Sequence, residues 1–334
     1  MSACSPATPE SRTLDYIERL ARPLDLAAPE YTAPPSSTIS PPRWQALQID
    51  IPADNVDGLD FLRLRGCALQ TTVARRNSSL GKVAPPSQRL LLDLAFLREA
   101  PACIEKLRNE DEQELAAQLN ESLVSKQQNL GSRIFNATLG GPEFRQFWQA
   151  GRQSEAYPAD TSSLVLTAAE QLAADVARWL DGDYRADSEK FELALSEIAK
   201  GDGGTLLVAL TRQGALLAAA DLLVDKQLAK GSLCEGGRID EAAPILRTVV
   251  QKFFIGQVQP QLAALNQRYH ALMPPLQTLE ETLRRSRRES LPAAFEEWTE
   301  RRDGALADAL AAPAAHVAQL QLLLGACYAE FAQN

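Results

Sequence analysis

The chain has 334 residues, of which 45% are hydrophobic and 23% are charged, and its formal net charge at pH 7 is -9. This balance is typical of a globular protein and excludes disorder over most of the chain. The acidic charge disfavours binding to nucleic acid, because no basic stripe offsets it. The richest apolar segment, residues 203–224, contains Arg212, Gln213 and Asp221, so we expect no membrane-spanning run.

The N-terminus contains a possible lipidation site. Ser2, Ala3 and Cys4 match the last three positions of the box that ends a bacterial lipoprotein signal peptide, and Met1 occupies the position of the usual Leu. The charged and apolar parts of a signal peptide are absent. We therefore interpret the chain as a mature sequence whose lipidated residue is Cys4 and whose residues 1–10 form a tether. The alternative is a cysteine in a disordered tail.

If Cys4 is lipidated, four cysteines remain, which are Cys67, Cys103, Cys234 and Cys327. In the oxidising periplasm these four can form two disulfides with no thiol left over. No spacing resembles C-x-x-C or another short ligand pair, so we expect no metal. We also expect no cofactor. Three connectivities are possible. We favour Cys67 with Cys103 and Cys234 with Cys327, because each pair would link neighbouring helices within one half of the chain. The alternative for Cys327 is a buried free thiol.

Residues 11–57 are predicted to form an N-terminal helix and then an extended segment. Between residues 26 and 57 the chain is rich in Pro and Ser and cannot sustain a helix. A structureless stretch of this length is unusual inside a compact domain. We expect it to run over the helical body, held there by its apolar residues, which are Trp44, Leu47, Ile49 and Ile51.

Residues 58–334 are predicted to form a helical body, because apolar residues recur at helical spacing and no convincing strand pattern appears. The fold class is therefore all-α, in a multi-helix, bundle-like architecture. Helices are expected within residues 59–73, 90–97, 115–123, 164–180, 191–198, 206–228, 246–253, 258–272 and 317–331. The eighth should end at Pro274-Pro275. A weaker break at 151–163 suggests two helical layers.

The segment at residues 74–89, ARRNSSLGKVAPPSQR, is predicted to connect two helices. Asn77 or Gly81 would end the first in a left-handed conformation, and Ser87 would cap the second. The functional alternative is an anion or carboxylate site beside a helix N-terminus. Its candidate binding residues are Arg76, Asn77, Ser78, Lys82, Ser87, Gln88 and Arg89. The spacing around Gly81 is not that of a phosphate loop.

The sequence contains no catalytic motif that we recognise, and we expect that the protein is not an enzyme. The two histidines, His270 and His316, lie outside any metal or general-base motif, and no G-x-S-x-G elbow occurs. His270 is expected to cap a helix end or to lie at the surface. The basic cluster at residues 284–288 follows Glu280 and Glu281 by four residues, which favours an exposed, charge-paired helix over a lipid-binding surface.

One segment resembles a known family. Residues 61–107, and above all the stretch RNSSLGKVAPPSQRL at 76–90, resemble the domain-of-unknown-function 3080 family of Gram-negative proteins, which are often described as lipoproteins. The resemblance extends to LDYIERLARPLD at 14–25 and to KFFIGQVQPQLAALNQRYHAL at 252–272. It implies a periplasmic location, lipid attachment at Cys4 and disulfides among the other cysteines. It implies no activity.

We expect a lipoprotein of the bacterial envelope. Ser5, rather than Asp, follows Cys4, which predicts sorting to the outer membrane, facing the periplasm, and more than one acyl chain would make the anchor stable. The function expected first is a non-enzymatic interaction or assembly factor, recognised by an exposed apolar patch. The alternative is a helical carrier that binds a small molecule or lipid in an apolar cavity between helices.

Overall fold

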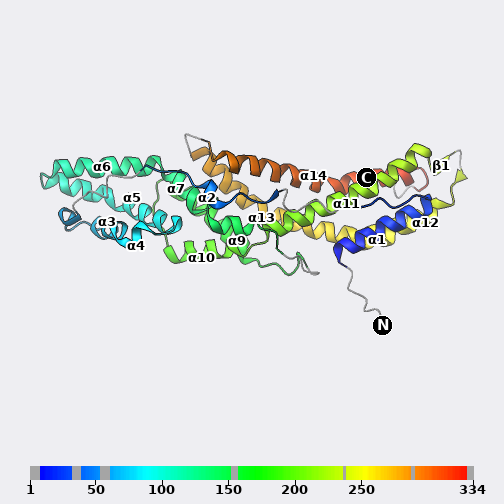
Figure 1. The fold of residues 1–334 in the computed structure, drawn as a ribbon, viewed down its shortest axis with the longest axis horizontal. Helices are drawn as coiled ribbons and strands as arrows, with labels where there is room; N and C mark the ends of the chain where they lie inside the picture. Colours follow the sequence, from blue (N-terminus) through cyan, green and yellow to red (C-terminus); the bar gives the residue numbers. More distant parts are fainter. Residues whose placement is uncertain are drawn as a thin grey trace.

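The computed structural model describes residues 8–31, 39–52, 61–151, 157–235, 238–286 and 290–328. Over these ranges the protein is an elongated assembly of α-helices, with the N-terminal helix packed near one end (Figure 1). The prediction of an all-α protein is confirmed. Cys4 lies outside the described residues.

The α-helices are α1 (Pro9–Ala21), α2 (Trp44–Leu47), α3 (Leu69–Asn77), α4 (Ser79–Lys82), α5 (Pro86–Asn109), α6 (Gln113–Gln128), α7 (Leu130–Ala137), α8 (Pro142–Phe147), α9 (Leu164–Leu180), α10 (Ser188–Ala199), α11 (Gly203–Lys230), α12 (Ala242–Val249), α13 (Gln259–Ser286) and α14 (Ala293–Leu324). Two short 3-10 helices, η1 (Arg22–Leu24) and η4 (Phe61–Leu64), and the π-helix η5 (Val250–Val258) complete the helical part. Strands β1 (Cys234–Glu235) and β2 (Arg238–Ile239) pair antiparallel.

Three apolar cores lie along the length of the molecule. The central core joins α7, α8, α9, α10 and α13 with parts of α5, α11 and α14. The α6-end core joins α3, α5 and α6, and the α1-end core joins α1, α11, α12, η5 and α14. Because α5, α11 and α14 each contribute to two cores, these long helices hold the three parts together.

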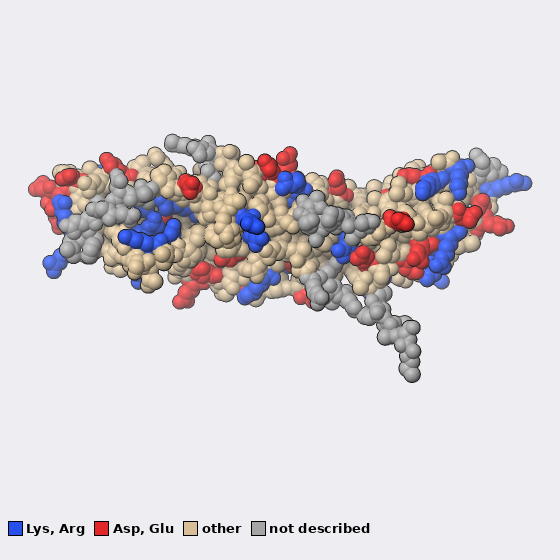
Figure 2. Space-filling model, in the orientation of Figure 1, with Lys and Arg blue, Asp and Glu red and all other residues tan. Residues whose placement is uncertain are grey.

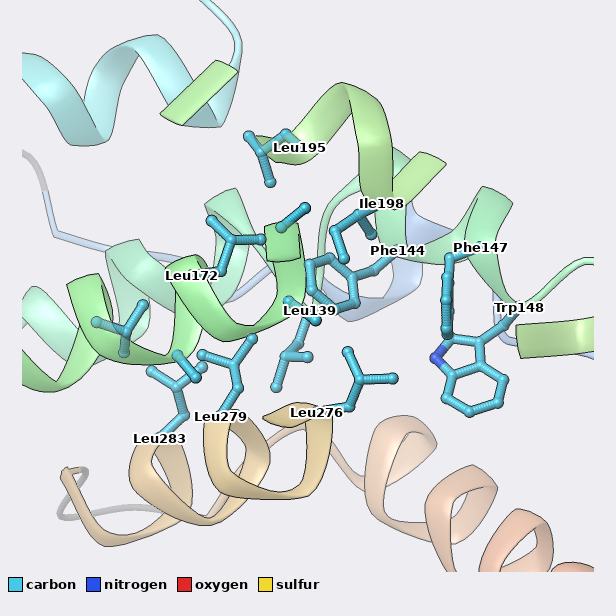
Figure 3. Packing of buried hydrophobic residues seen from close by; sticks show 14 of the residues in the cluster. Leu139, Phe144, Phe147, Trp148, Leu172, Leu195, Ile198, Leu276, Leu279 and Leu283 are labelled. Atoms are coloured by element: carbon cyan, nitrogen blue, oxygen red, sulfur yellow. The ribbon is translucent and has the colours of Figure 1, made fainter. Parts of the chain in front are cut away.

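The central core is packed by side chains from helices that are far apart in the sequence. In Figure 3, Leu172 of α9 and Leu195 of α10 lie across from Leu276 and Leu279 of α13, with Phe144 of α8 between the layers. All five are at most 2% exposed. Burial of such side chains stabilises a fold by roughly 1.5–3 kcal/mol each, which explains why these apolar stripes dominate the helix pattern.

Two sequence expectations about helix ends are wrong. Helix α13 continues through Pro274 and Pro275, because Met273 and Leu276 on either side are 1% exposed in the central core and hold the helix in place. The helix expected over residues 59–73 is divided into η4 and α3. Gly66, with φ of +83°, turns the chain between them, in a left-handed conformation that glycine adopts without strain.

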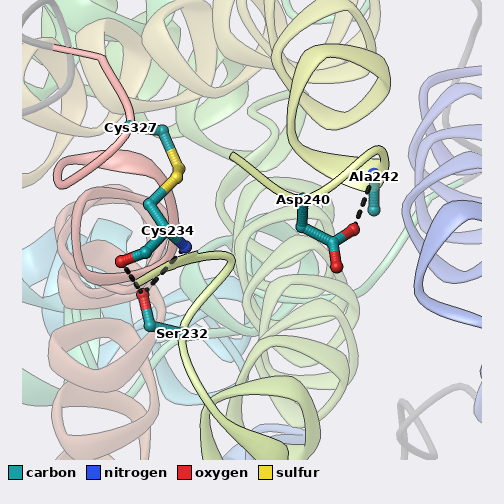
Figure 4. The surroundings of a disulfide bond; sticks show 5 residues. All are labelled: Ser232, Cys234, Asp240, Ala242 and Cys327. Atoms are coloured by element: carbon teal, nitrogen blue, oxygen red, sulfur yellow. Dashed lines mark hydrogen bonds between the residues drawn. A yellow bond between two sulfur atoms is a disulfide. The ribbon is translucent and has the colours of Figure 1, made fainter. Parts of the chain in front are cut away.

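Two disulfides lie at the two ends of the molecule. Cys67, before α3, is bonded to Cys103 of α5, with their Cα atoms 5.4 Å apart. Cys234 of β1 is bonded to Cys327, just after α14, with Cα atoms 5.5 Å apart (Figure 4). These are the two pairs that we favoured from the sequence, and Cys327 is not a free thiol.

Helix α11 is more apolar than we expected from the sequence. The stretch Ser188–Lys230, which contains α10 and α11, has the length and composition to cross a membrane, with a mean hydropathy of 1.5 over its most apolar 18 residues. Half of that window is buried inside the protein, where α11 packs along α14 and α1. A core helix has the same composition, and α11 contributes to two of the three cores.

The Pro-rich segment is held by side chains of α7 and α14. The amide of Asn136 accepts a hydrogen bond from Ile49 N (2.8 Å) and donates one to Ile49 O (2.9 Å). Leu47 is 4% exposed, and the indole of Trp298 donates to Ile39 O at 3.2 Å. Asn136 therefore satisfies both backbone groups of an extended residue, as a neighbouring strand would.

Candidate functional site

The turn between α3 and α5 is closed by a set of local hydrogen bonds. The hydroxyl of Ser78 accepts from Gly81 N at 3.0 Å and donates to Arg75 O at 2.7 Å, so Ser78 caps the short helix α4. The guanidinium of Arg89, in the first turns of α5, donates to Lys82 O at 2.7 Å. These bonds connect the two sides of the turn and fix its backbone.

The conformation of this turn differs from the one predicted from the sequence. Neither Asn77 nor Gly81 is left-handed, because α3 leads directly into α4 through the extended residue Ser78. Gly81 is required for a different reason, since a Cβ atom there would clash with the carbonyl oxygens of Arg75 and Arg76.

Ser87 does not cap α5. The N-cap is Pro85, and Pro86 is the first helical residue, a position where proline's missing N–H group leaves no unsatisfied donor. Ser87 follows as the second helical residue and is 8% exposed.

The turn projects two large apolar side chains into solvent. Leu80 and Val83 are 79% and 77% exposed, the highest values among the large apolar residues that the structure describes. They lie on and beside α4, whose backbone is fixed by the bonds of Ser78 and Arg89. We call Leu80 and Val83 the apolar knob.

A basic hollow of about 440 Å³ opens next to the apolar knob. Its charged lining residues are Arg76, Arg89, Lys126, Arg133, Asp50 and Asp93. Figure 2 shows Lys and Arg side chains gathered over α3, α4 and α5 around a hollowed part of the surface. Four cations and two carboxylates give the described lining a net positive charge, on a protein whose net charge is -9.

Asp93 organises the cations of the basic hollow. It is 2% exposed, and its two carboxylate oxygens each accept a bond of 2.7 Å, from Lys126 Nζ and from Arg133 Nη1. Arg76 Nη1 lies 3.9 Å from the same carboxylate. A buried carboxylate needs such partners, because an unpaired buried charge is strongly destabilising. Asp93 therefore positions cations from α3, α6 and α7 in one place.

The structure brings together only part of the predicted binding set. Arg76 and Arg89 line the basic hollow, while Lys82 and Ser78 build the turn itself. Gln88 points elsewhere, because its amide donates to Glu192 Oε1 of α10 at 2.5 Å.

Asn77 is half-buried, and its side-chain oxygen has no hydrogen-bond partner within the described ranges. Ser87 is buried at the start of α5. Of the predicted anion site, only Arg76 and Arg89 therefore line the hollow. The other charged residues that line it come from distant parts of the sequence.

The three buried charged residues of the basic hollow, Asp93, Lys126 and Arg133, were missed in the prediction from the sequence. Asp93 interrupts the apolar run LLLDLAFL, and Arg133 stands before Ile134 and Phe135, so both charges fall within apolar stripes. A charge at such a position is buried only if it is paired. That signal could have linked them, whereas nothing in the sequence around Lys126 points to Asp93.

His316 was also missed. It is fully buried, with Nδ1 2.6 Å from Asp221 Oδ1 and Nε2 2.7 Å from the hydroxyl of Tyr16. The three residues come from α14, α11 and α1. Since Tyr16 is also 0% exposed, we assign the trio a structural role in fixing α1 to the body. His270, by contrast, is exposed in the middle of α13, not at a helix end.

The basic cluster near residue 284 forms the predicted ion pairs, but only the pair of Arg285 is exposed, because Glu280 is 3% exposed and also accepts from Arg302. Arg284 lies 3.8 Å from Glu280 and Arg285 lies 3.6 Å from Glu281. The remaining residues of the cluster, 287 and 288, lie outside the described residues. Within the described ranges, no group of three or more His, Cys, Asp or Glu side chains is arranged to hold a metal ion.

Fold and site together define an elongated, disulfide-bonded helical protein with an exposed apolar knob beside a basic hollow. The model of the family described as "Protein of unknown function (DUF3080)" matches residues 14–330, nearly the whole chain. The chain belongs to this family. No curated protein and no solved structure matches it.

Proposed function

We propose that the protein is a non-enzymatic factor of the bacterial envelope that binds another envelope protein through the apolar knob and the basic hollow. The observation that carries this proposal is the exposure of Leu80 and Val83 on a backbone fixed by Ser78 and Arg89. Contiguous exposed apolar patches that are rimmed by polar groups mark interaction sites, and Leu80 and Val83 lie on one turn, three residues apart. A fixed backbone also loses little conformational entropy on binding.

The charge around the knob specifies the chemistry of the partner. Lys82 and Arg89 are exposed next to Leu80 and Val83, and the basic hollow lies beside them. A partner that fits this surface presents an apolar contact flanked by Asp or Glu side chains. Complementary charges of this kind accelerate association and fix the orientation of the complex.

The location that we propose is the outer membrane, facing the periplasm, with a lipid on Cys4. The Ser2-Ala3-Cys4 box and the two disulfides support it, since disulfides persist in oxidising compartments. The test is labelling with radioactive palmitate of cells that express the protein behind a lipoprotein signal peptide. Label should appear in the wild type and be lost in Cys4→Ser, with the wild type in the outer-membrane fraction. Label that persists in Cys4→Ser would refute the anchor.

The binding surface is tested with substitutions that leave the fold intact. In Leu80→Ser/Val83→Ser, two exposed side chains are replaced, so the melting temperature should stay the same while co-purification of the envelope partner is lost. Leu322→Ser is the matched control, because Leu322 is 66% exposed on α14 and lies outside the turn. Equal co-purification with the double variant and the control would contradict the proposal.

A further inference from the structure

A second cavity, a groove of about 980 Å³, opens between α11 and α14. Its floor is made of small residues, among them Gly214, Ala215 and Ala309, and its walls include Ile39 and Trp148. The two helices approach closely at the floor, since a Cβ atom on Gly214 would lie 3.2 Å from Ala309 Cα. The groove has the size of a small-molecule site, and it is lined mainly by apolar atoms.

The groove explains the unusual apolarity of α11. Only half of the most apolar 18 residues in the stretch Ser188–Lys230, which contains α11, is buried in the protein. The groove is lined by residues of α11 that are half-buried or exposed, namely Val208, Ala215 and Ala218. A helix that is apolar on all sides is normally covered on all sides. The groove face of α11 is therefore suited to an apolar ligand.

One of the two cations in the groove has no partner among the residues that the structure describes. Arg145 lines it, and its guanidinium makes no hydrogen bond or ion pair with any part of the chain that the structure describes. Its Nε atom is buried and unsatisfied. The other cation, Arg212, lies 3.0 Å from Glu10, so its charge is matched. Asp308 of α14 also lines the groove, and it is exposed.

The helix dipole adds to the charge of Arg145. Gly204, in the first turn of α11, lines the groove, and a Cβ there would clash with the backbone of Trp148 and Gln149, which follow Arg145. The N-terminal end of α11 is thus packed against the segment that carries Arg145. The positive end of a helix dipole favours an anion.

We propose that this groove binds one long-chain fatty acid. The acyl chain lies along the small-residue floor between α11 and α14, and the carboxylate bonds to Arg145. A single chain fits the close approach of the helices at Gly214, and a carboxylate supplies the acceptor that Arg145 lacks. This activity is separate from the protein-binding role proposed above, because it uses none of the residues of the apolar knob or the basic hollow.

The experiment is calorimetric titration of the purified full chain with palmitate below its micelle concentration, and with the uncharged analogue hexadecanol. The wild type should bind one palmitate per chain and bind hexadecanol at least tenfold more weakly. Arg145→Gln should weaken palmitate binding about tenfold or more and leave hexadecanol binding unchanged, because it removes a charged hydrogen bond. Arg301→Gln, an exposed arginine of α14 outside the groove, is the matched control.

A second variant tests the place of the acyl chain. Ala215→Phe fills the floor and should abolish binding of both ligands, with folding checked by circular dichroism. The proposal is overturned if the wild type binds no palmitate, if hexadecanol binds as tightly as palmitate, or if Arg145→Gln and Arg301→Gln behave alike. Partner binding that persists in Leu80→Ser/Val83→Ser, with palmitate binding intact, would refute only the protein-binding role.

Discussion

His316 and Asp221 form a hydrogen bond of 2.6 Å between Nδ1 and Oδ1, where α14 packs against α11. The other ring nitrogen lies 2.7 Å from the hydroxyl of Tyr16, which brings the first helix into the same network. The ring of Phe254 packs on both Tyr16 and His316, so the network is closed off by an aromatic side chain. One buried imidazole thus links α1 to both α11 and α14.

Tyr16 gives this network a pH dependence at the alkaline end. Burial, and then the charge of Asp221, raise the pKa of Tyr16 well above its ordinary value of 10.0. The folded protein therefore holds the phenolic proton more tightly than the unfolded chain does. This contribution to stability is complete below pH 10 and is lost as the pH rises above it.

We predict that the unfolding free energy falls as the pH rises above 10, and that Tyr16→Phe makes the fall smaller. Tyr157, whose pKa is also raised by burial, should account for part of what remains. At neutral pH, Tyr16→Phe should destabilise by about 1–2 kcal/mol, because it removes a buried hydrogen bond. Denaturant unfolding at a series of pH values measures both effects. A fall of equal size in wild type and Tyr16→Phe would contradict the assignment.

The two disulfides should stabilise different parts of the molecule. Their sequence separations are 36 and 93 residues, which correspond to roughly 4 and 4.5 kcal/mol on the chain-entropy model. Cys67→Ala/Cys103→Ala should increase amide exchange in the α6-end core, and Cys234→Ala/Cys327→Ala in the α1-end core. Hydrogen exchange with mass spectrometry locates the changes. Equal exchange along the whole chain in both variants would show that the cores do not act separately.

Asp93 should be the most sensitive charged position near the basic hollow. Asp93→Ala leaves Lys126 and Arg133 without their shared carboxylate, and we expect a loss of about 3–5 kcal/mol in unfolding free energy. Glu281→Ala removes an exposed pair with Arg285 and should change it by less than about 1 kcal/mol. Chemical denaturation compares the two variants. Similar losses would mean that Asp93 is not a buried anchor.

Gly81 should be essential for the turn that carries the apolar knob. In Gly81→Ala the new methyl group meets the carbonyl oxygens of Arg75 and Arg76, so the cap formed by Ser78 cannot close. We expect faster amide exchange over residues 78–84 and weaker partner binding, with exchange in the α1-end core unchanged. Ser79→Ala, on the same short helix but exposed, serves as the control. Unaltered exchange in Gly81→Ala would refute this explanation of the glycine.

Much of the architecture could be predicted from the sequence, because apolar side chains at helical spacing decide which segments become buried helices. Leu172 of α9 and Leu195 of α10 belong to such stripes, and both lie in the central core. The prediction failed at Pro274, where packing on both sides of the proline is stronger than its local preference to end a helix. The intrinsic helix propensity of a residue is a weak preference, and packing in the core can override it.

The candidate site was predictable only in part. Arg76 and Arg89 stand out in the sequence because they flank a distinctive turn, and both reach the basic hollow. Arg133 is marked in the sequence only by its place within an apolar stripe, and Lys126 enters the hollow through folding of α6, which no local pattern encodes. The same holds for His316, whose partners Asp221 and Tyr16 are 95 and 300 residues away along the chain.

The central claim is that the turn between α3 and α5 contacts a partner protein in the envelope. Site-specific photo-crosslinking in living cells tests it most directly, with the photoreactive residue at position 83 and, as control, at position 322. We predict one discrete adduct at position 83 that disappears when Arg89→Glu is added, and no such adduct at position 322. Adducts of the same pattern at both positions, or an adduct that Arg89→Glu leaves unchanged, would contradict the account.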